Sequence, residues 1–281
     1  MNSKLVLEKI KNSIAEFETV GEAGAIAFLI LEDQFQISRM DVLLEKEIET
    51  SISIDKKIDS ILSELKSGKP IQHILGKVEF YGRQFLVNPN VLIPRRETEE
   101  LVHLILENNP DLSEQLIVDI GTGSGIIPIT IAKERKHCEV YAVDISSSAL
   151  ATAKRNALLN HAKVSFIQAD ILIEDLDLPK SNIWISNPPY VLEKEKAEMQ
   201  TKVFEHEPAN ALFVPNHDAL KFYERITQLA SQHLIKGGEL YFEINEQFGR
   251  EVKKLMEEKG FRDVKIMGDM QGKDRFVFGR R

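Results

Sequence analysis

The sequence is poor in cysteine and in long hydrophobic runs, and both scarcities narrow what the protein can be. Cys138 is the only cysteine among 281 residues, so no disulfide can form within the chain, which suits a reducing compartment. Without a cluster of cysteine and histidine, the sequence predicts no metal site. The longest apolar run, from Ala23 to Leu31, has nine residues and is too short to cross a bilayer. Because the charged N-terminal residues lack the apolar core of a signal peptide, we expect a cytoplasmic protein that does not bind membranes.

Positive charge is also scarce. The chain has 36 Lys and Arg against 44 Asp and Glu, which gives a net charge of −8. A dedicated nucleic-acid binder normally carries a basic surplus over its binding face, so the composition argues against a stable nucleic-acid complex, although a local basic patch would be compatible with it. With 43% hydrophobic and 28% charged residues, the chain has the composition of a soluble globular protein. Its length predicts one large domain or two unequal ones.

The most informative feature that is present is the run Asn187-Pro188-Pro189-Tyr190, which follows the apolar residues 183–185 of a predicted buried strand. Two prolines cannot continue a sheet, because neither has an N–H to donate and both fix φ. The residue before a proline is held extended, so the Asn187 carboxamide projects from the strand end. We expect the Asn187 oxygen and the Pro188 carbonyl to accept the two hydrogens of a planar amine, with Tyr190 covering its face. An ordinary Asn-Pro turn is the alternative.

A glycine-rich turn lies upstream, between a predicted strand at 116–120 and a predicted helix. Glycines allow close backbone approach, and a helix N-terminus supplies free N–H groups to a nucleotide-type ligand. The spacing G-x-G-x-G is shorter than the G-x-G-x-x-G of dinucleotide sites. By itself the turn fits a nicotinamide dinucleotide or S-adenosylmethionine, and the short spacing favours the second, whose sulfonium end has no pyrophosphate. The turn consists of Gly121, Thr122, Gly123, Ser124 and Gly125.

Strands and helices alternate from residue 116 onward, which predicts an α/β fold with a mainly parallel, doubly wound sheet. We expect helices between the first four strands, a long helix at 217–235, and two closing strands at 263–266 and 275–278, one of them antiparallel. The expected strands before them are 116–120, 139–143, 164–168, 182–186 and 238–244.

Ligands in such sheets bind beyond the carboxyl ends of the strands. The glycine turn, Asp144, Asp170 and Asn187 all fall at those ends. Asp144 ends the second strand, where a carboxylate can accept hydrogen bonds from both ribose hydroxyls. A cofactor module followed two strands later by a grip for an amine points to methyl transfer onto nitrogen.

The first part of the chain has a different pattern. Residues 1–66 show helical periodicity typical of a small bundle, with Ser38 capping a short helix. Residues 78–87 alternate as a β-hairpin with its turn at Gly82, and a helix capped near Thr98 follows. A bundle that only stabilises the main domain and one that binds a partner are both compatible with this pattern.

The motifs Val118–Gly125 and Asn187–Tyr190 resemble those of the HemK/PrmC family, the methyltransferases that modify a glutamine side chain in class I peptide chain release factors. The resemblance covers nearly the whole chain, and the segments Pro70–Gly76 and Leu92–Glu99 are its most specific parts. It implies a Rossmann-like, seven-stranded S-adenosylmethionine-dependent methyltransferase domain at 91–281, a β-hairpin linker at 77–90, and a helical domain at 1–76 that helps hold the release factor. Further matches are Glu207, Pro208, Ala211, Leu212, Asp269, Gly272, Asp274 and Arg275.

The resemblance also implies roles for individual residues. Asn187, Pro188 and Tyr190 would carry catalysis and, with Pro189, bind the substrate amide. The whole glycine turn, Asp144, Asp170 and Asn187 would contact S-adenosylmethionine, with Asp170 as the acceptor near adenine. Ile171 would lie against adenine, where some relatives carry an aromatic residue.

Other functions share parts of this pattern. Methyltransferases that act on nucleic-acid amines or on a ribosomal-protein glutamine use the same Asn-Pro-Pro-Tyr motif. A nicotinamide-dependent oxidoreductase and a non-catalytic S-adenosylmethionine-binding scaffold are the remaining alternatives. His206 could serve as a base, but a charged loop favours a solvated histidine there.

Overall fold

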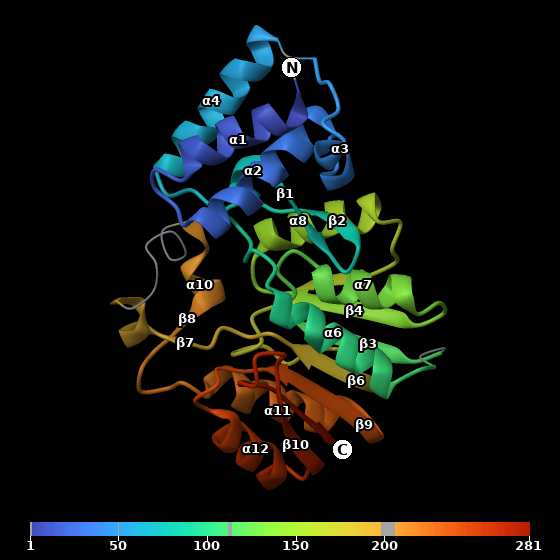
Figure 1. Cartoon of the computed structure of the whole chain (residues 1–281). Helices are drawn as coiled ribbons and strands as arrows, with labels where there is room; N and C mark the ends of the chain where they lie inside the picture. The colour runs from blue at the N-terminus through green and yellow to red at the C-terminus, as the bar shows by residue number, and fades with distance from the viewer. Residues whose placement is uncertain (1, 50, 112–113, 198–205) are drawn as a thin grey trace. The chain divides into compact units, whose positions relative to one another are not determined.

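Figure 1 shows the computed structural model of the chain, which describes residues 2–49, 51–111, 114–197 and 206–281. The chain divides into compact units. One contains Met1–Gly76 and, among the described residues, also His206; the other contains Lys77–Gln200 and Glu207–Arg281.

The first unit is helical, as predicted, and its helices begin at side-chain caps. Asn2, Thr19, Ser38 and Ser51 each accept a hydrogen bond from a backbone N–H of the first helical turn, which satisfies donors that the helix itself leaves free. Ser38 also forms a reciprocal capping box with Asp41, so the predicted cap at Ser38 is confirmed. The helices are α1 (Ser3–Ile14), α2 (Val20–Phe35), α3 (Arg39–Leu43), α4 (Ile52–Lys66) and α5 (Ile71–Leu75).

The second unit starts with the predicted β-hairpin, β1 (Lys77–Phe80) and β2 (Arg83–Leu86). Its two turn residues, Tyr81 and Gly82, have φ of 50° and 69°, as a tight hairpin turn that matches strand twist requires. The hairpin packs against helix α8 (Ser147–Leu159), where Asn156 accepts from the backbone N–H of Leu86 and donates to its carbonyl. The hairpin, which was predicted to be a linker, is therefore part of the second unit and packs against α8.

A seven-stranded sheet forms the centre of this unit, in the order β10-β11-β9-β6-β3-β4-β5. Five neighbouring strands run parallel, and β11 pairs antiparallel with β9 and β10. The predicted parallel sheet with one antiparallel closing strand is confirmed. The strands are β3 (Leu116–Ile120), β4 (Glu139–Asp144), β5 (Ser165–Gln168), β6 (Ser181–Ser186), β9 (Leu234–Glu243), β10 (Arg262–Gly268) and β11 (Asp274–Arg280).

Helices cover both faces of the sheet (Figure 1). On one face, residues of α6 (Arg96–Asn108), α7 (Ile126–Glu134) and α8 share a hydrophobic cluster with Ile117. On the other face, α11 (Lys221–His233) and α12 (Gly249–Glu258) share a cluster with Val118. Because adjacent strand residues point to opposite faces, a strand buried on both faces is mostly apolar, as β3 is with four apolar residues and one buried acid, Asp119.

One predicted helix is wrong. Residues 171–180, between β5 and β6, form a turn and then irregular backbone. Leu176 and Leu178 are buried there while Asp175 and Asp177 are exposed, which is the period of extended chain rather than of a helix.

The remaining short elements among the described residues are β7 (Val191–Leu192), η1 (Glu193–Ala197), α10 (Ala209–Leu212) and β8 (Phe213–Val214), with β7 and β8 paired in parallel. Among the described residues, every helix is too short or too polar to traverse a lipid bilayer.

Candidate active site

Most of the predicted site residues lie around one cavity at the carboxyl ends of the parallel strands. All of its walls come from the second unit. Segments that follow four different strands meet there, at the place where sheets of this kind bind ligands. The predicted residues that line it are Gly121, Gly123, Asp144, Asp170, Ile171, Asn187, Pro188 and Pro189.

The glycine turn contributes to the cavity through only two of its residues. Gly121 and Gly123 have φ of 74° and 54°, and a Cβ added to either would meet no atom within 4 Å, so their backbone borders open space. Gly125 has another role, because a Cβ there would lie 3.0 Å from the side chains of Ala153 and Ile129. Thr122 and Ser124 are buried and do not line the cavity. Thr122, Ser124 and Gly125 therefore lie outside the cavity lining and support the shape of the turn. The sequence predicts direct cofactor contacts for all three.

Asp144 connects the glycine turn to the following helix. Its Oδ2 accepts from the Gly123 N–H at 2.8 Å, and its Oδ1 accepts from the Ser146 N–H at 2.8 Å. Burial raises the pKa of Asp144 above its ordinary value, although these hydrogen bonds oppose the shift. An ionised carboxylate has about four lone-pair sites, so two backbone bonds leave acceptor capacity toward the cavity.

Asp170 and Ile171 form a second wall. Asp170 Oδ1 accepts from the Leu172 N–H at 3.0 Å, and Arg225 Nε donates to the Ile171 carbonyl at 2.7 Å. These bonds fix the turn that replaces the predicted helix, and they hold an acidic and an apolar side chain at the cavity edge.

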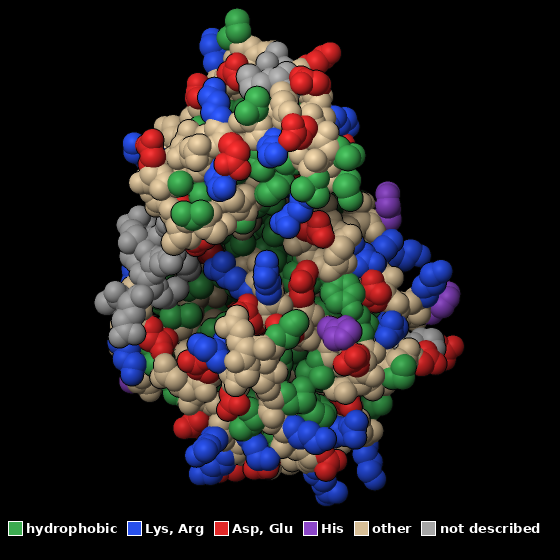
Figure 2. Space-filling view, viewed as in Figure 1, with side chains coloured by type: hydrophobic (Ala, Val, Ile, Leu, Met, Phe, Trp, Pro, Cys, Tyr) green, Lys and Arg blue, Asp and Glu red, His purple; other side chains and the backbone are tan. Residues whose placement is uncertain are grey.

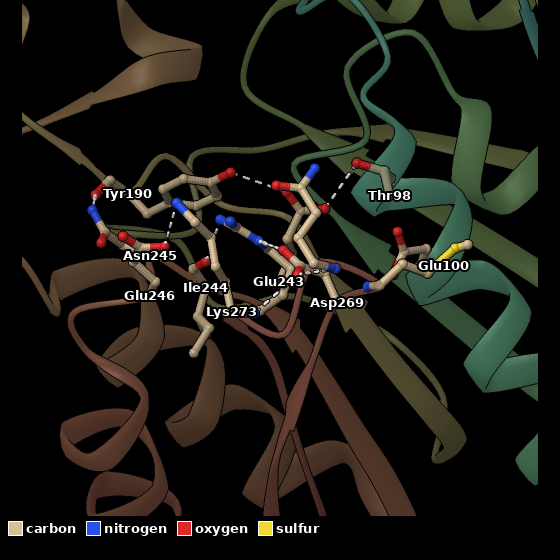
Figure 3. Close-up of polar contacts among 12 residues, drawn as sticks. Thr98, Glu100, Tyr190, Glu243, Ile244, Asn245, Glu246, Asp269 and Lys273 are labelled. Atoms are coloured by element: carbon tan, nitrogen blue, oxygen red, sulfur yellow. Dashed lines mark hydrogen bonds and ion pairs between the residues drawn. The ribbon is translucent and has the colours of Figure 1, made fainter.

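Asn187 leaves β6 beside a buried hydrogen-bonded chain. Its Nδ2 donates to the hydroxyl of Thr98 at 3.2 Å. That hydroxyl donates in turn to Glu243 Oε2 at 2.8 Å, a contact shown in Figure 3. With one hydrogen of the carboxamide nitrogen engaged by Thr98, the Oδ1 atom is directed away from Thr98 and is available as an acceptor.

Glu243 ends β9 inside the protein and is 1% exposed. Its Oε1 accepts from the Tyr190 hydroxyl at 3.0 Å, so Figure 3 shows Tyr190 and Thr98 converging on one carboxylate. Burial raises the pKa of Glu243 to about 7, while the hydrogen bonds from Thr98 and Tyr190 and the nearby charge of Arg275 oppose this shift.

The structure corrects the expected position of Tyr190. Its ring packs against the hydrophobic cluster under α11 and α12, and it does not line the cavity. With its hydroxyl on Glu243, Tyr190 anchors the motif to β9, where a ring stacked over the substrate amide was expected. Its backbone carbonyl is held as well, because Asn245 Nδ2 donates to it at 3.2 Å.

Two residues of this site were missed from the sequence. Thr98 was expected near a helix cap, but α6 begins at Arg96, and the hydroxyl serves Glu243 and Asn187. Glu243 is an acidic residue near the carboxyl end of the predicted strand at 238–244, and Asp144 likewise lies at the carboxyl end of its strand. This position at a strand end could have identified Glu243.

The 207–212 segment is joined to the loop before α6 by an ion pair. Arg95 Nη2 donates to Glu207 Oε1 at 2.6 Å, and the Glu207 side chain is 1% exposed. Pro208 follows directly and lines the cavity.

His206, expected to be solvated, is half-buried, and its Nε2 has no hydrogen-bond partner among the described residues. No group of three or more His, Cys, Asp or Glu that could hold a metal occurs in the described part of the chain.

The cavity suits S-adenosylmethionine. The backbone of Gly121 and Gly123 can approach a ligand closely, Asp144 has free acceptor sites for ribose hydroxyls, and Ile171 offers an apolar surface to a flat base.

Solved structures share the fold. A methyltransferase from Pyrococcus furiosus is 16% identical with a TM-score of 0.53, over 79% of this chain and 98% of that one. A 16S rRNA methyltransferase of T. thermophilus in complex with AdoMet and guanosine is 14% identical with a TM-score of 0.52, over 73% of this chain and 49% of that one.

The match of residues 95–273 to a methyltransferase family model, together with the fold and the cavity, defines a Rossmann-like methyltransferase whose cofactor is S-adenosylmethionine. The family matched by residues 95–273 is the methyltransferase small domain family, and residues 6–76 match the PrmC N-terminal domain family.

Similar sequences narrow this class to one family. A release factor glutamine methyltransferase of Flavobacterium psychrophilum is 43% identical over 260 residues, 91% of each chain. One of Bacteroides thetaiotaomicron is 41% identical over 273 residues, 97% of this chain and 98% of the other. The chain belongs to the release factor glutamine methyltransferase family.

Asp144→Ala is expected to weaken S-adenosylmethionine binding by about tenfold to a hundredfold, since a charge-assisted hydrogen bond contributes about 1.5–3 kcal/mol. Titration calorimetry measures this directly. Asp177→Ala, an exposed aspartate of the same unit, is the matched control and should bind normally. Unchanged affinity in a folded Asp144→Ala protein would remove Asp144 from the site.

Proposed function

We propose that the protein transfers a methyl group from S-adenosylmethionine to the side-chain amide nitrogen of a glutamine in class I peptide chain release factors. The observation that carries the proposal is the Asn187 carboxamide, whose nitrogen is engaged by Thr98 and whose residue lines the cavity together with Gly121 and Asp144. An acceptor oxygen at the cavity is what an amide N–H of a substrate requires as a partner. Membership of the family supports the same substrate.

The proposed chemistry depends on positioning. A carboxamide nitrogen is a poor nucleophile because its lone pair is delocalised into its carbonyl group. S-adenosylmethionine supplies an electrophilic methyl group when bound. Asn187 Oδ1 and the Pro188 carbonyl would accept the two amide hydrogens, orient the nitrogen, and favour the positive charge that develops on it during attack. The methylated amide then loses a proton readily to water, so the site needs no strong base.

We do not expect a stable complex with nucleic acid. Lys and Arg lie interspersed with Asp and Glu over the face seen in Figure 2, whereas nucleic-acid binding normally uses a continuous basic surface. The reaction would take place in the cytoplasm, where release factors act.

A side-by-side assay tests the substrate class. The protein is incubated with labelled S-adenosylmethionine and, separately, a class I release factor, ribosomal protein, RNA or DNA. We expect label in the release factor alone. Label in RNA or DNA, with none in the release factor, would instead support the alternative of a nucleic-acid amine methyltransferase.

We further propose that the first unit docks the release factor. Hydrophobic side chains gather over α3 in Figure 2, and Met40, Leu43 and Leu44 there are 63%, 76% and 73% exposed. Apolar side chains clustered on a surface are typical of protein interaction sites.

Replacing Leu43 and Leu44 together by glutamate is expected to raise the KM for an intact release factor by about tenfold, as loss of a few central interface residues does. The KM for a short glutamine peptide should not change, because a short peptide would contact only the cavity. Leu158→Glu, which alters an equally exposed leucine of α8 (77%), is the control. Equal effects on peptide and protein would contradict docking at this surface.

A further inference from the structure

The side chains behind Asn187 come from segments that are far apart in the sequence. Thr98 lies in the first turn of α6 and is 2% exposed, and Glu243 ends β9. The chain of contacts runs from Glu243 Oε2 to the Thr98 hydroxyl at 2.8 Å, and from that hydroxyl to Asn187 Nδ2 at 3.2 Å. All three residues belong to the second unit.

We propose that Thr98 and Glu243 are positioning residues that determine which end of the Asn187 carboxamide faces the substrate. The inference rests on the proposed function, because the orientation matters only if Asn187 must accept a hydrogen from the substrate amide. Neither residue touches the reacting atoms.

The orientation follows from the number of hydrogens available. A threonine hydroxyl has one hydrogen and can otherwise only accept. In this structure its hydrogen is donated to Glu243 Oε2, so Thr98 presents only a lone pair to Asn187. The side of the carboxamide that meets a lone pair must be the NH2 group, and the carbonyl oxygen is thereby directed away from Thr98.

In its ionised form, Glu243 is held as an acceptor by its surroundings. Tyr190 donates its hydroxyl hydrogen to Oε1 at 3.0 Å, so both carboxylate oxygens receive hydrogen bonds. Arg275, which is itself held by Asp269 through a contact of 3.1 Å, adds a positive charge nearby. Tyr223 donates to the Glu243 backbone carbonyl at 3.3 Å and fixes the end of the strand.

Glu243→Gln would reverse this polarity without changing the shape. The new NH2 group can donate to the Thr98 hydroxyl, which would then give its own hydrogen to Asn187. Asn187 would turn its oxygen toward Thr98 and its NH2 toward the substrate amide. Two donors would then face each other, which opposes the expected binding of the amide hydrogens.

The first test replaces the Thr98 hydroxyl. Thr98→Val keeps the side-chain shape, and Thr98→Ser keeps the hydroxyl. With a release factor as substrate, we expect Thr98→Val to lower kcat roughly tenfold to a hundredfold, the scale of a misplaced reacting group. KM and S-adenosylmethionine affinity should stay within a few-fold, and Thr98→Ser should restore most of kcat. Equal losses in Thr98→Val and Thr98→Ser would overturn the inference, because packing alone would explain them.

The second test examines whether Glu243 acts on Asn187 through the Thr98 hydroxyl. Glu243→Gln should lower kcat at least as much as Thr98→Val, and the double variant should lose no more than Thr98→Val alone, since Glu243 acts through the hydroxyl. Additive losses would show independent roles and contradict the inference.

A spectroscopic measurement separates this inference from the proposed function. In protein with isotopically labelled asparagine, the NH2 resonances of Asn187 are assigned by their loss in Asn187→Ala. They should shift in Thr98→Val and in Glu243→Gln, and remain close to wild type in Thr98→Ser. Unchanged resonances in Thr98→Val would overturn the inference even in a protein that methylates release factors. Shifted resonances in a protein that methylates no release factor would sustain the orientation and reject the proposed function.

Discussion

Replacing Asn187 by alanine is expected to lower turnover by roughly a hundredfold or more, the scale observed when one hydrogen-bond partner of a transition state is removed. The alanine removes the Oδ1 acceptor that we propose for a substrate amide hydrogen. This contact strengthens as charge develops on the nitrogen, so the loss should appear in kcat more than in substrate affinity. Single-turnover kinetics with a release factor measure the chemical step.

Cofactor affinity serves as the internal control for this variant. S-adenosylmethionine binding to Asn187→Ala should stay within a few-fold of wild type. Pro188→Ala keeps the backbone carbonyl and should be milder. Tyr190→Phe should lower turnover more than Pro188→Ala does, because it removes one of the hydrogen-bond donors to Glu243. Near-normal turnover in Asn187→Ala would show that the proposed grip on the amide is wrong.

The second large effect is expected at Asn156, a fully buried residue of α8. Its Oδ1 accepts from the Leu86 N–H at 2.7 Å, and its Nδ2 donates to the carbonyls of Leu86 at 3.0 Å and Ser124 at 2.9 Å. One side chain therefore links the β-hairpin to the glycine turn. Asn156→Ala leaves three backbone groups unpaired, and each buried unpaired group costs about 1–3 kcal/mol, so unfolding should become easier by at least about 3 kcal/mol.

Urea unfolding followed by tryptophan fluorescence measures this loss. Trp184 is the only tryptophan of the chain and is buried in the sheet of the second unit, so it reports on that unit. Asn160→Ala is the matched control, since Asn160 also binds the hairpin, at the Gln84 carbonyl, but is partly exposed. S-adenosylmethionine affinity should also fall in Asn156→Ala, because the glycine turn loses a support. A stability loss no larger than that of Asn160→Ala would contradict this role.

Local patterns explain which parts of the fold could be predicted. A strand buried on both faces is mostly apolar, and four of the five residues at 116–120 are apolar, so this strand is recognisable without any knowledge of its neighbours. Because parallel strands end at the same edge of a sheet, Asp144, Asp170 and Asn187 could be expected to lie together. The left-handed backbone of Gly121 and Gly123 likewise depends only on the local turn.

The contacts that support Asn187 could not be predicted in the same way. Thr98 and Glu243 are separated by 145 positions, and only the tertiary fold brings the first turn of α6 to the end of β9. The position of Tyr190 depends on the same long-range contact, since its hydroxyl has Glu243 as its partner. The helix predicted between the strands at 164–168 and 182–186 is absent for a local reason, because leucine and aspartate alternate at 175–178 with the period of extended chain.

Tandem mass spectrometry of a class I release factor, incubated with S-adenosylmethionine in the presence and absence of the protein, tests the proposed function most directly. We predict that one peptide of the release factor gains a single methyl group, and that fragmentation places it on the side-chain amide of a glutamine. The same peptide should stay unmodified with Asn187→Ala over the same reaction time. An unmodified glutamine with active wild-type protein, or a methyl group on a different residue, would contradict the account.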